Sequence, residues 1–267
     1  MESLKNRSIG IFDSGVGGLT VAKSVRKLLP HEDIIYFGDT ARVPYGNKSK
    51  ATITRFAHQI MFFLMEKRVK LVVVACNTAS SLSLGSLKRH YRVPVTGVIG
   101  PGVREAVRLS KNGRVGVIGT SSTVSSKAYD RELAKAKGSY RLFGKSCPLF
   151  VPLVENGFTS DPVTYKVARK YLKEFKAKRI DTLILGCTHY PLLKGVIAKV
   201  MGNVRLVDSS LAVAREVKGM LGDKGLDACR GRRPGTIRCY VSDDAEGFRK
   251  TAGMFLKEKI DVKKVTL

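Results

Sequence analysis

The feature that most constrains the fold of this 267-residue chain is a regular alternation of two kinds of segment. Short apolar runs rich in β-branched residues alternate with longer stretches in which apolar residues recur every three or four positions, as in Val16–Leu29. Such runs are typical of strands buried on both faces of a parallel sheet, and such stretches are typical of amphipathic helices. The alternation predicts an α/β fold with helices on both faces of mostly parallel sheets.

The expected strands fall into a clear and a weaker group. The clear ones are Ile9–Phe12, Ile34–Phe37, Leu71–Ala75, Val93–Val98, Val115–Ile118, Leu183–Leu185 and Val204–Val207. The weaker ones are Tyr140–Phe143, Ile237–Val241 and Val262–Leu267. Helical periodicity is found in Val16–Leu29, Ile53–Lys67, Pro162–Phe175, Leu211–Leu221 and Ala245–Lys259.

The ends of the expected strands repeat along the chain. One strand leads into Cys76–Thr78, and another leads into Cys187–His189, 111 residues later. The strand before Asp13–Gly15 has a counterpart before Thr120–Ser122, about 106 residues later. Two matches at nearly equal spacing indicate two related halves. We therefore expect two similar, pseudo-twofold related α/β domains, the first formed by 1–98 with 211–267 and the second by 99–210.

Two of the five cysteines follow strands at the end of a parallel sheet where ligands bind. A single buried cysteine is most often a small hydrophobic residue, but Cys76 and Cys187 occupy equivalent places in the two halves. A thiolate can remove a proton from carbon while a thiol across a cleft delivers one, which inverts the centre without a cofactor. The remaining cysteines lack this setting, and we predict structural roles for them: Cys147, Cys229 and Cys239.

Asp13 ends the first expected strand and precedes a glycine-rich turn, Gly15–Gly18. The carboxylate could assist a neighbouring thiol, or it could simply cap the following helix. The turn could also be a phosphate loop, but it lacks both G-x-G-x-x-G and a following Gly-Lys-Ser/Thr, so we disfavour a nucleotide. Its backbone amides would still suit a substrate carboxylate.

Other polar residues lie near the expected strand ends. Pro44-Tyr45-Gly46 fixes a turn in a loop that could cover a substrate or serve only structure. Asn77 and Thr78 could bind charged substrate groups or cap the next helix, and His189 follows Cys187 closely. Glu155 lies on an otherwise apolar stretch. No pair of histidines has metal-ligand spacing and no C-x-x-C motif occurs, so we expect no metal.

Six segments together resemble the glutamate racemases, a family within the cofactor-independent aspartate/glutamate racemase superfamily. They are IGIFDSGVGGLT, DTARVPYGNKS, VVVACNTAS, GVIGPGV, LILGCTHYPLL and VDSS, in the family's order between Ile9 and Ser210. Either cysteine motif alone would be weak, whereas the pair is specific.

The resemblance implies interconversion of L- and D-glutamate for bacterial peptidoglycan, by a homodimer whose site lies between two domains. It implies no cofactor and no metal. Cys76 and Cys187 would be the proton donors and acceptors, with Asp13 assisting the first and His189 and Glu155 the second. The residues implied to bind substrate are Asp13, Ser14, Pro44, Tyr45, Gly46, Asn77, Thr78, Thr188 and His189.

The net charge of +26 points first to an acidic partner. The excess is spread along the chain, at +9 for residues 1–98, +12 for 99–210 and +5 for 211–267, so we expect no nucleic-acid binding beyond a non-specific kind. Basic clusters such as Lys176–Arg179 and Arg230–Arg233 are interpreted as solvated surface. The apolar runs are too short to cross a membrane and no signal peptide is evident, which favours a soluble cytoplasmic protein. Aspartate as substrate and a nucleic-acid-binding protein remain the alternatives.

Overall fold

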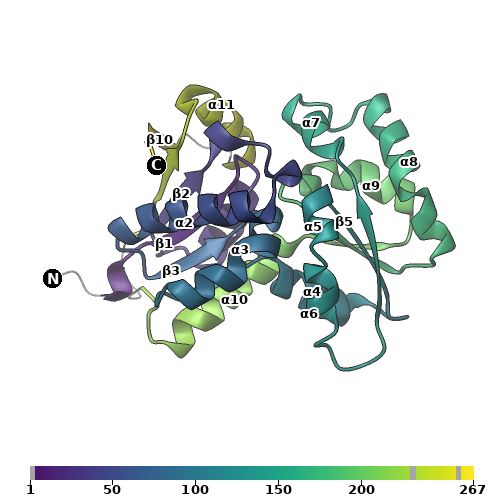
Figure 1. The fold of residues 1–267 in the computed structure, drawn as a ribbon, viewed down its shortest axis with the longest axis horizontal. Helices are drawn as coiled ribbons and strands as arrows, with labels where there is room; N and C mark the ends of the chain where they lie inside the picture. Colours follow the sequence, from purple (N-terminus) through teal and green to yellow (C-terminus); the bar gives the residue numbers. More distant parts are fainter. Residues whose placement is uncertain (1–3, 229–232, 257–259) are drawn as a thin grey trace. The chain divides into compact units, whose positions relative to one another are not determined.

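A computed structural model describes residues 4–228, 233–256 and 260–267. The chain divides into two compact units, the first formed by Met1–Val98 with Ser210–Leu267 and the second by Ile99–Ser209. The helices and strands of each unit are labelled in Figure 1.

The first unit holds a parallel sheet of six strands in the order β10-β9-β2-β1-β3-β4. Its strands are β1 (Ile9–Asp13), β2 (Ile34–Gly38), β3 (Leu71–Val74), β4 (Val95–Gly97), β9 (Ile237–Val241) and β10 (Asp261–Lys264). Its helices are α1 (Leu19–Leu28), α2 (Lys50–Glu66), α3 (Asn77–His90), α10 (Ser209–Asp223) and α11 (Ala245–Leu256), with short 3-10 turns η1 (Leu4–Asn6), η2 (Thr40–Arg42) and η3 (Tyr45–Asn47).

Adjacent residues of β2 show how this sheet is covered. Phe37 packs its ring 5.2 Å from that of Phe63 on α2, while Tyr36 lies 6.0 Å from the ring of Phe248 on α11. Successive side chains of a strand point to opposite faces, so α2 and α11 cover opposite faces of the sheet. Every residue of β1 and β2 is buried, which explains why both strands are nearly continuous apolar runs.

The second unit holds a parallel sheet of four strands in the order β6-β5-β7-β8. Its strands are β5 (Arg114–Gly119), β6 (Arg141–Ser146), β7 (Thr182–Gly186) and β8 (Arg205–Val207). Its helices are α4 (Ile99–Leu109), α5 (Ser121–Ser125), α6 (Ala128–Leu133), α7 (Phe150–Glu155), α8 (Pro162–Ala177) and α9 (Lys194–Met201), with a 3-10 turn η4 (Tyr190–Leu193).

Helices also cover both faces of the second sheet. Leu183 and Leu185 of β7 belong to a buried cluster with Leu172 and Phe175 of α8. Ile184 points to the other face, where a Cβ placed on Gly102 of α4 would be 3.9 Å from its side chain. The close packing of α8 and α9 against this sheet is visible in Figure 1.

The two sheets repeat one topology. In each, the first strand lies between the second and the third, and the fourth pairs with the third. The register repeats as well, because Ile9 pairs with Leu71 in the first sheet and Val115 with Thr182 in the second. These partners differ by the same 106 and 111 residues that separate the sequence motifs. Strands β9 and β10 extend only the first sheet, beyond β2.

Several boundaries differ from those predicted by periodicity. The helix expected from Val16 begins at Leu19, because Gly15–Gly18 form a turn first. The last strand ends at Lys264 rather than at Leu267, and the structure places Ser210 in the first unit. The helix expected to reach Lys259 is described to Leu256, and the rest of its expected range lies outside the described residues. Over the described ranges, none of the helices has the length and apolarity needed to cross a membrane.

Candidate active site

Cys76 lies two residues after β3, at the point where α3 begins. It is 5% exposed and is the N-cap residue of α3, with its sulfur accepting a hydrogen bond from the amide of Ala79 at 3.5 Å. The thiol also lies 3.7 Å from the hydroxyl of Ser14, to which it can donate. A sulfur at a helix N-terminus lies in a positive potential, which favours its thiolate form. We call Asp13, Ser14, Cys76, Asn77 and Thr78 the Cys76 cluster.

Asp13 is fully buried at the end of β1. Its Oδ2 accepts hydrogen bonds of 3.1 Å from the amides of both Gly15 and Gly18, so the carboxylate organises the turn before α1. Tyr36 closes the same region by donating to the carbonyl of Gly15 at 2.7 Å. Burial, with the nearby Asp13, Cys239 and Cys76, raises the pKa of Tyr36, so this hydroxyl stays protonated.

Gly18 is required by this packing. A Cβ at this position would lie 2.5 Å from the Cβ of Asp13 and 2.8 Å from the hydroxyl of Tyr36. Such distances are shorter than any ordinary contact, so a larger residue would displace the carboxylate. The glycine-rich turn therefore brings α1 close to the end of β1, which positions Asp13.

The loop of residues 40–49 is held by a buried carboxylate that sequence reasoning did not single out. Asp39 is fully buried and accepts hydrogen bonds from Tyr45 Oη, from Arg42 Nε and, at 2.8 Å, from Ser242 Oγ. Burial raises the pKa of Tyr45, and the charges of Asp39 and Cys76 raise it further. The electrostatic influence of Cys76 on Tyr45 shows that the two lie close together. Pro44 is exposed in the same loop.

Cys187 directly follows β7 and is 7% exposed. Its sulfur lies 3.8 Å from Nδ1 of His189, which is itself buried. The other ring nitrogen, Nε2, lies 3.3 Å from Oε1 of Glu155, the last residue of α7. A thiol, an imidazole and a carboxylate therefore lie in sequence, an arrangement in which each group can orient the next. These three residues and the buried Thr188 form what we call the Cys187 cluster.

Three residues that no sequence pattern indicated support the Cys187 cluster. Tyr190 is fully buried and donates to the carbonyl of Cys147 at 2.9 Å, which anchors the turn after Cys187. Burial raises the pKa of Tyr190 and of Tyr129, and the charge of Cys187 adds to both shifts. Burial likewise raises the pKa of Cys147. All three are apolar in sequence context, so only the folded arrangement reveals them.

The candidate residues group around the two thiols. In the first unit the structure brings together Cys76 with Ser14, and Asp13 with the amides of its own turn; Asn77 and Thr78 are buried in the first turn of α3. Gly46 is half-buried. Cys239 is buried in β9, whereas Cys229 falls outside the described residues, as do positions 230–232 of the basic cluster. No three His, Cys, Asp or Glu side chains within the described ranges are grouped to hold a metal ion.

The two clusters are equivalent in topology but differ chemically. Each thiol follows the third strand of its sheet, and the paired registers make Cys76 the counterpart of Cys187. In the first unit the carboxylate lies at the end of β1, whereas the same register position in the second unit is Gly119. There the carboxylate is Glu155, which acts through His189.

Fold and site together define a repeated parallel α/β protein with one thiol at the same strand end of each unit. Residues 19–217 match the family model described as Asp/Glu/Hydantoin racemase. The chain therefore belongs to this family and is an amino-acid racemase, an isomerase.

Three relatives illustrate the similarity. The chain is 48% identical over 264 residues to the glutamate racemase of Geobacter metallireducens, covering 98% of this chain and 97% of the relative. The crystal structure of glutamate racemase isoform RacE1 from Bacillus anthracis superposes with a TM-score of 0.95 at 37% identity, covering 98% of both chains. That of Francisella tularensis glutamate racemase, in complex with D-glutamate, gives 0.91 at 40% identity and covers 98% of both.

Proposed function

We propose that this protein is a glutamate racemase that interconverts L- and D-glutamate by proton transfer between two thiols. The observation that carries the proposal is the equivalent placement of Cys76 and Cys187 after the third strand of each sheet. Relatives that cover almost the whole chain bear the name glutamate racemase, which favours glutamate over aspartate.

In the proposed reaction one cysteine is a thiolate and the other a thiol. The thiolate removes the proton from the α-carbon, and the thiol gives its proton to the opposite face of the resulting carbanion. One C–H bond breaks, another forms, and the two sulfurs exchange protonation states. The mechanism requires both clusters to reach the same substrate molecule, and it needs neither metal nor cofactor.

Each thiol has different assistance in this proposal. Asp13 assists Cys76, and the turn held by its carboxylate also carries Ser14, whose hydroxyl lies near the thiol. His189 assists Cys187, because its Nδ1 faces the sulfur, and Glu155 orients the imidazole from the other side. An imidazole beside a sulfur can take up or supply the proton that the thiol exchanges.

The substrate's charged groups would be bound by donors around the two thiols. The amides at the start of α3 and the side chains of Asn77 and Thr78 suit a carboxylate, since a helix N-terminus favours negative charge. The loop at Pro44–Gly46 would contribute further contacts, as would Asp13, Ser14, Thr188 and His189. We further propose that the enzyme is a cytoplasmic homodimer that supplies D-glutamate for peptidoglycan.

The test is to replace each thiol singly, in Cys76→Ser and Cys187→Ser, and to follow glutamate by circular dichroism. Both variants should lose racemisation while keeping the far-ultraviolet spectrum of the wild type. Cys239→Ser, a buried thiol of the first unit, is the matched control and should stay active. Full activity in either cysteine variant would refute the two-thiol mechanism, and faster turnover of L-aspartate than of L-glutamate would refute the substrate.

A further inference from the structure

Two adjoining cavities lie between α8 and α9, within the second unit and away from the residues of the Cys187 cluster. The larger has a volume of about 630 Å³ and is lined in part by Pro162, Tyr165 and Val196. The smaller, of about 280 Å³, is lined by Lys173, Lys176 and Val200 among others. Tyr165, Arg169 and Lys199 line both, so the two form one continuous groove. We call it the α8–α9 groove.

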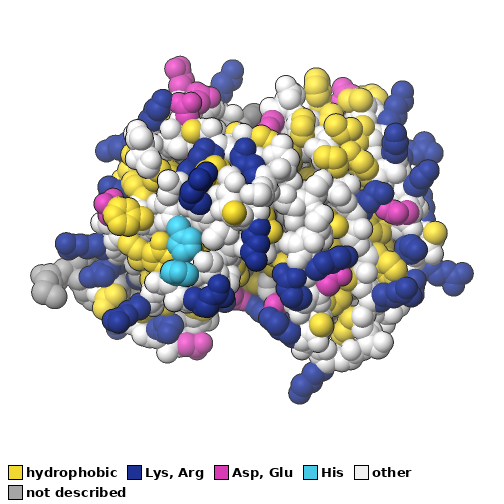
Figure 2. Space-filling model, in the orientation of Figure 1, with side chains coloured by type: hydrophobic (Ala, Val, Ile, Leu, Met, Phe, Trp, Pro, Cys, Tyr) yellow, Lys and Arg dark blue, Asp and Glu magenta, His cyan; other side chains and the backbone are white. Residues whose placement is uncertain are grey.

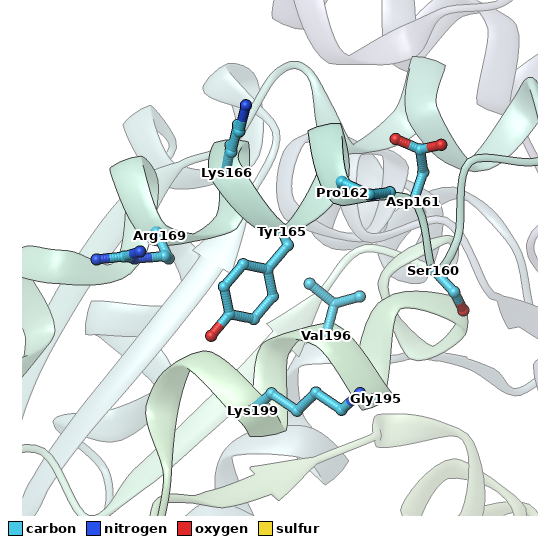
Figure 3. A pocket seen from close by; sticks show the side chains of 9 residues that line it. All are labelled: Ser160, Asp161, Pro162, Tyr165, Lys166, Arg169, Gly195, Val196 and Lys199. Carbon is cyan, nitrogen blue, oxygen red and sulfur yellow. The ribbon is translucent and has the colours of Figure 1, made fainter.

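The two ends of the α8–α9 groove differ in chemistry. At the larger end the ring of Tyr165 projects from α8 between the two helices, with Val196 of α9 beside it (Figure 3). Tyr165 is 37% exposed, so one side of the ring is open to a ligand. This end offers an aromatic ring and aliphatic carbon, and its volume falls within the range of small-molecule sites. It suits a planar ring, because aromatic side chains stack on any base.

The smaller end is cationic. Arg169, Lys173 and Lys176 recur at helical spacing along one side of α8, over about 10 Å, and Lys199 faces them from α9. Figure 2 shows dark-blue side chains gathered along the edge where α8 lies. None of these four cations forms an ion pair with another residue of the described part of the chain. A groove that gathers several uncompensated guanidinium and ammonium groups is suited to phosphate oxygens.

The nearby carboxylates do not neutralise this end. Asp161 caps α8, accepting from the amide of Val163 at 2.7 Å, and its carboxylate points away from Tyr165 (Figure 3). Glu174 of α8 pairs with Lys145 at 2.9 Å, and it lines neither cavity. The positive potential of the groove is therefore left for a ligand.

From this arrangement we propose that the α8–α9 groove is a binding site for a nucleoside polyphosphate. The base would stack on Tyr165 at the larger end, and the phosphates would follow Arg169, Lys173, Lys176 and Lys199 at the smaller end. The site is separate from the proposed racemase function and does not depend on it.

The test is calorimetric titration of the full-length protein with ATP, tripolyphosphate and a single-stranded dT20 oligonucleotide at physiological ionic strength. ATP should bind saturably with one site per chain. Tyr165→Ala should weaken ATP at least about threefold while leaving tripolyphosphate unchanged, because only ATP carries a base to stack. Arg169→Ala/Lys199→Ala should weaken both at least about fivefold, since each lost contact with phosphate costs a factor of a few.

The matched control is Lys170→Ala/Lys194→Ala, which removes one exposed cation from each of the same helices but none that lines the groove. It should bind ATP as the wild type does. Equal weakening in the control and the groove variant would overturn the proposal in favour of non-specific charge attraction. Tighter binding of dT20 than of ATP would overturn it in favour of a nucleic-acid surface. Melting temperature and far-ultraviolet dichroism verify the fold of each variant, independently of racemase activity.

Discussion

Nε2 of His189 lies 3.3 Å from Oε1 of Glu155, and the two residues differ sharply in exposure. The imidazole side chain is 7% exposed, whereas the side chain of Glu155 is 48% exposed. The carboxylate thus reaches from the surface to a buried ring whose other nitrogen faces Cys187. Through this relationship a residue at the end of α7 can set the orientation of the group beside the thiol.

We expect His189→Asn to lower kcat for glutamate by about 100-fold, within the range for loss of an acid–base group. Glu155→Gln should lower kcat less, by about tenfold, because its carboxylate is half exposed and orients the ring without touching the sulfur. Steady-state assays in both directions, with the pH profile of kcat, measure both effects. A Glu155→Gln enzyme more impaired than His189→Asn would contradict this order of action.

Gly18→Ala should destabilise the protein by about 1–3 kcal/mol, because its Cβ would collide with Asp13 and Tyr36. Turnover should fall as well, since the carboxylate that organises the turn would be displaced. Urea denaturation gives the free energy of unfolding and racemisation gives the activity.

Gly85→Ala is the control for that substitution. Gly85 lies inside α3, and its added Cβ would meet Arg89 only at an ordinary 3.7 Å. This variant should be unchanged or stabilised by up to about 1 kcal/mol, as alanine favours helix. If both variants lost the same stability, the close approach at Gly18 would not be the cause.

Asp181 joins the turn before β5 to the start of β7. Its burial acts to raise the pKa of its carboxyl, but hydrogen bonds from Ser110 and from the amides of Asn112 and Lys111 outweigh this and lower the pKa. A folded-state pKa below the unfolded value means that the carboxylate stabilises the fold above about pH 4 and loses this effect as the pH falls through the folded pKa.

We therefore expect Asp181→Asn to lower the free energy of unfolding by about 1 kcal/mol at pH 7, a small value because the carboxyl is largely exposed to solvent screening. The difference from wild type should shrink as the pH falls below about 4. Denaturation curves between pH 7 and pH 3 measure this trend. A difference that stayed constant over that range would show that ionisation of Asp181 is not involved.

The sequence predicted the strands well, because each is a short apolar run buried on both faces, as in β1 and β3. It also predicted the repeat, since register and motif spacing both follow from strand length. It failed for α4 and the short helices of the second unit, and for Asp39 and Tyr190, whose partners are distant or hidden in apolar context. Pairings such as Asp39 with Ser242 join residues about 200 positions apart, which no local pattern encodes.

Lys70 and Glu32 form an ion pair of 2.6 Å in which both side chains are almost fully buried. The ammonium also donates to the carbonyls of Lys5 at 2.7 Å and Leu226 at 2.8 Å, so it joins three distant segments of the first unit. Lys70→Met would leave the carboxylate of Glu32 buried without its counter-charge, and it should cost about 3–5 kcal/mol of unfolding free energy. Denaturant titration at pH 7 measures the loss.

Adding Glu32→Met to Lys70→Met should recover part of this loss, because the pair of apolar side chains no longer buries an uncompensated charge. Recovery should be incomplete, since the carbonyls of Lys5 and Leu226 and the amide of Ala228, which donates to Glu32, all lose a partner. Lys88→Met, at an exposed position of α3, is the control and should change stability by less than about 0.5 kcal/mol. A double variant less stable than Lys70→Met would mean that those backbone partners, rather than the buried charge, dominate the energetics of Lys70.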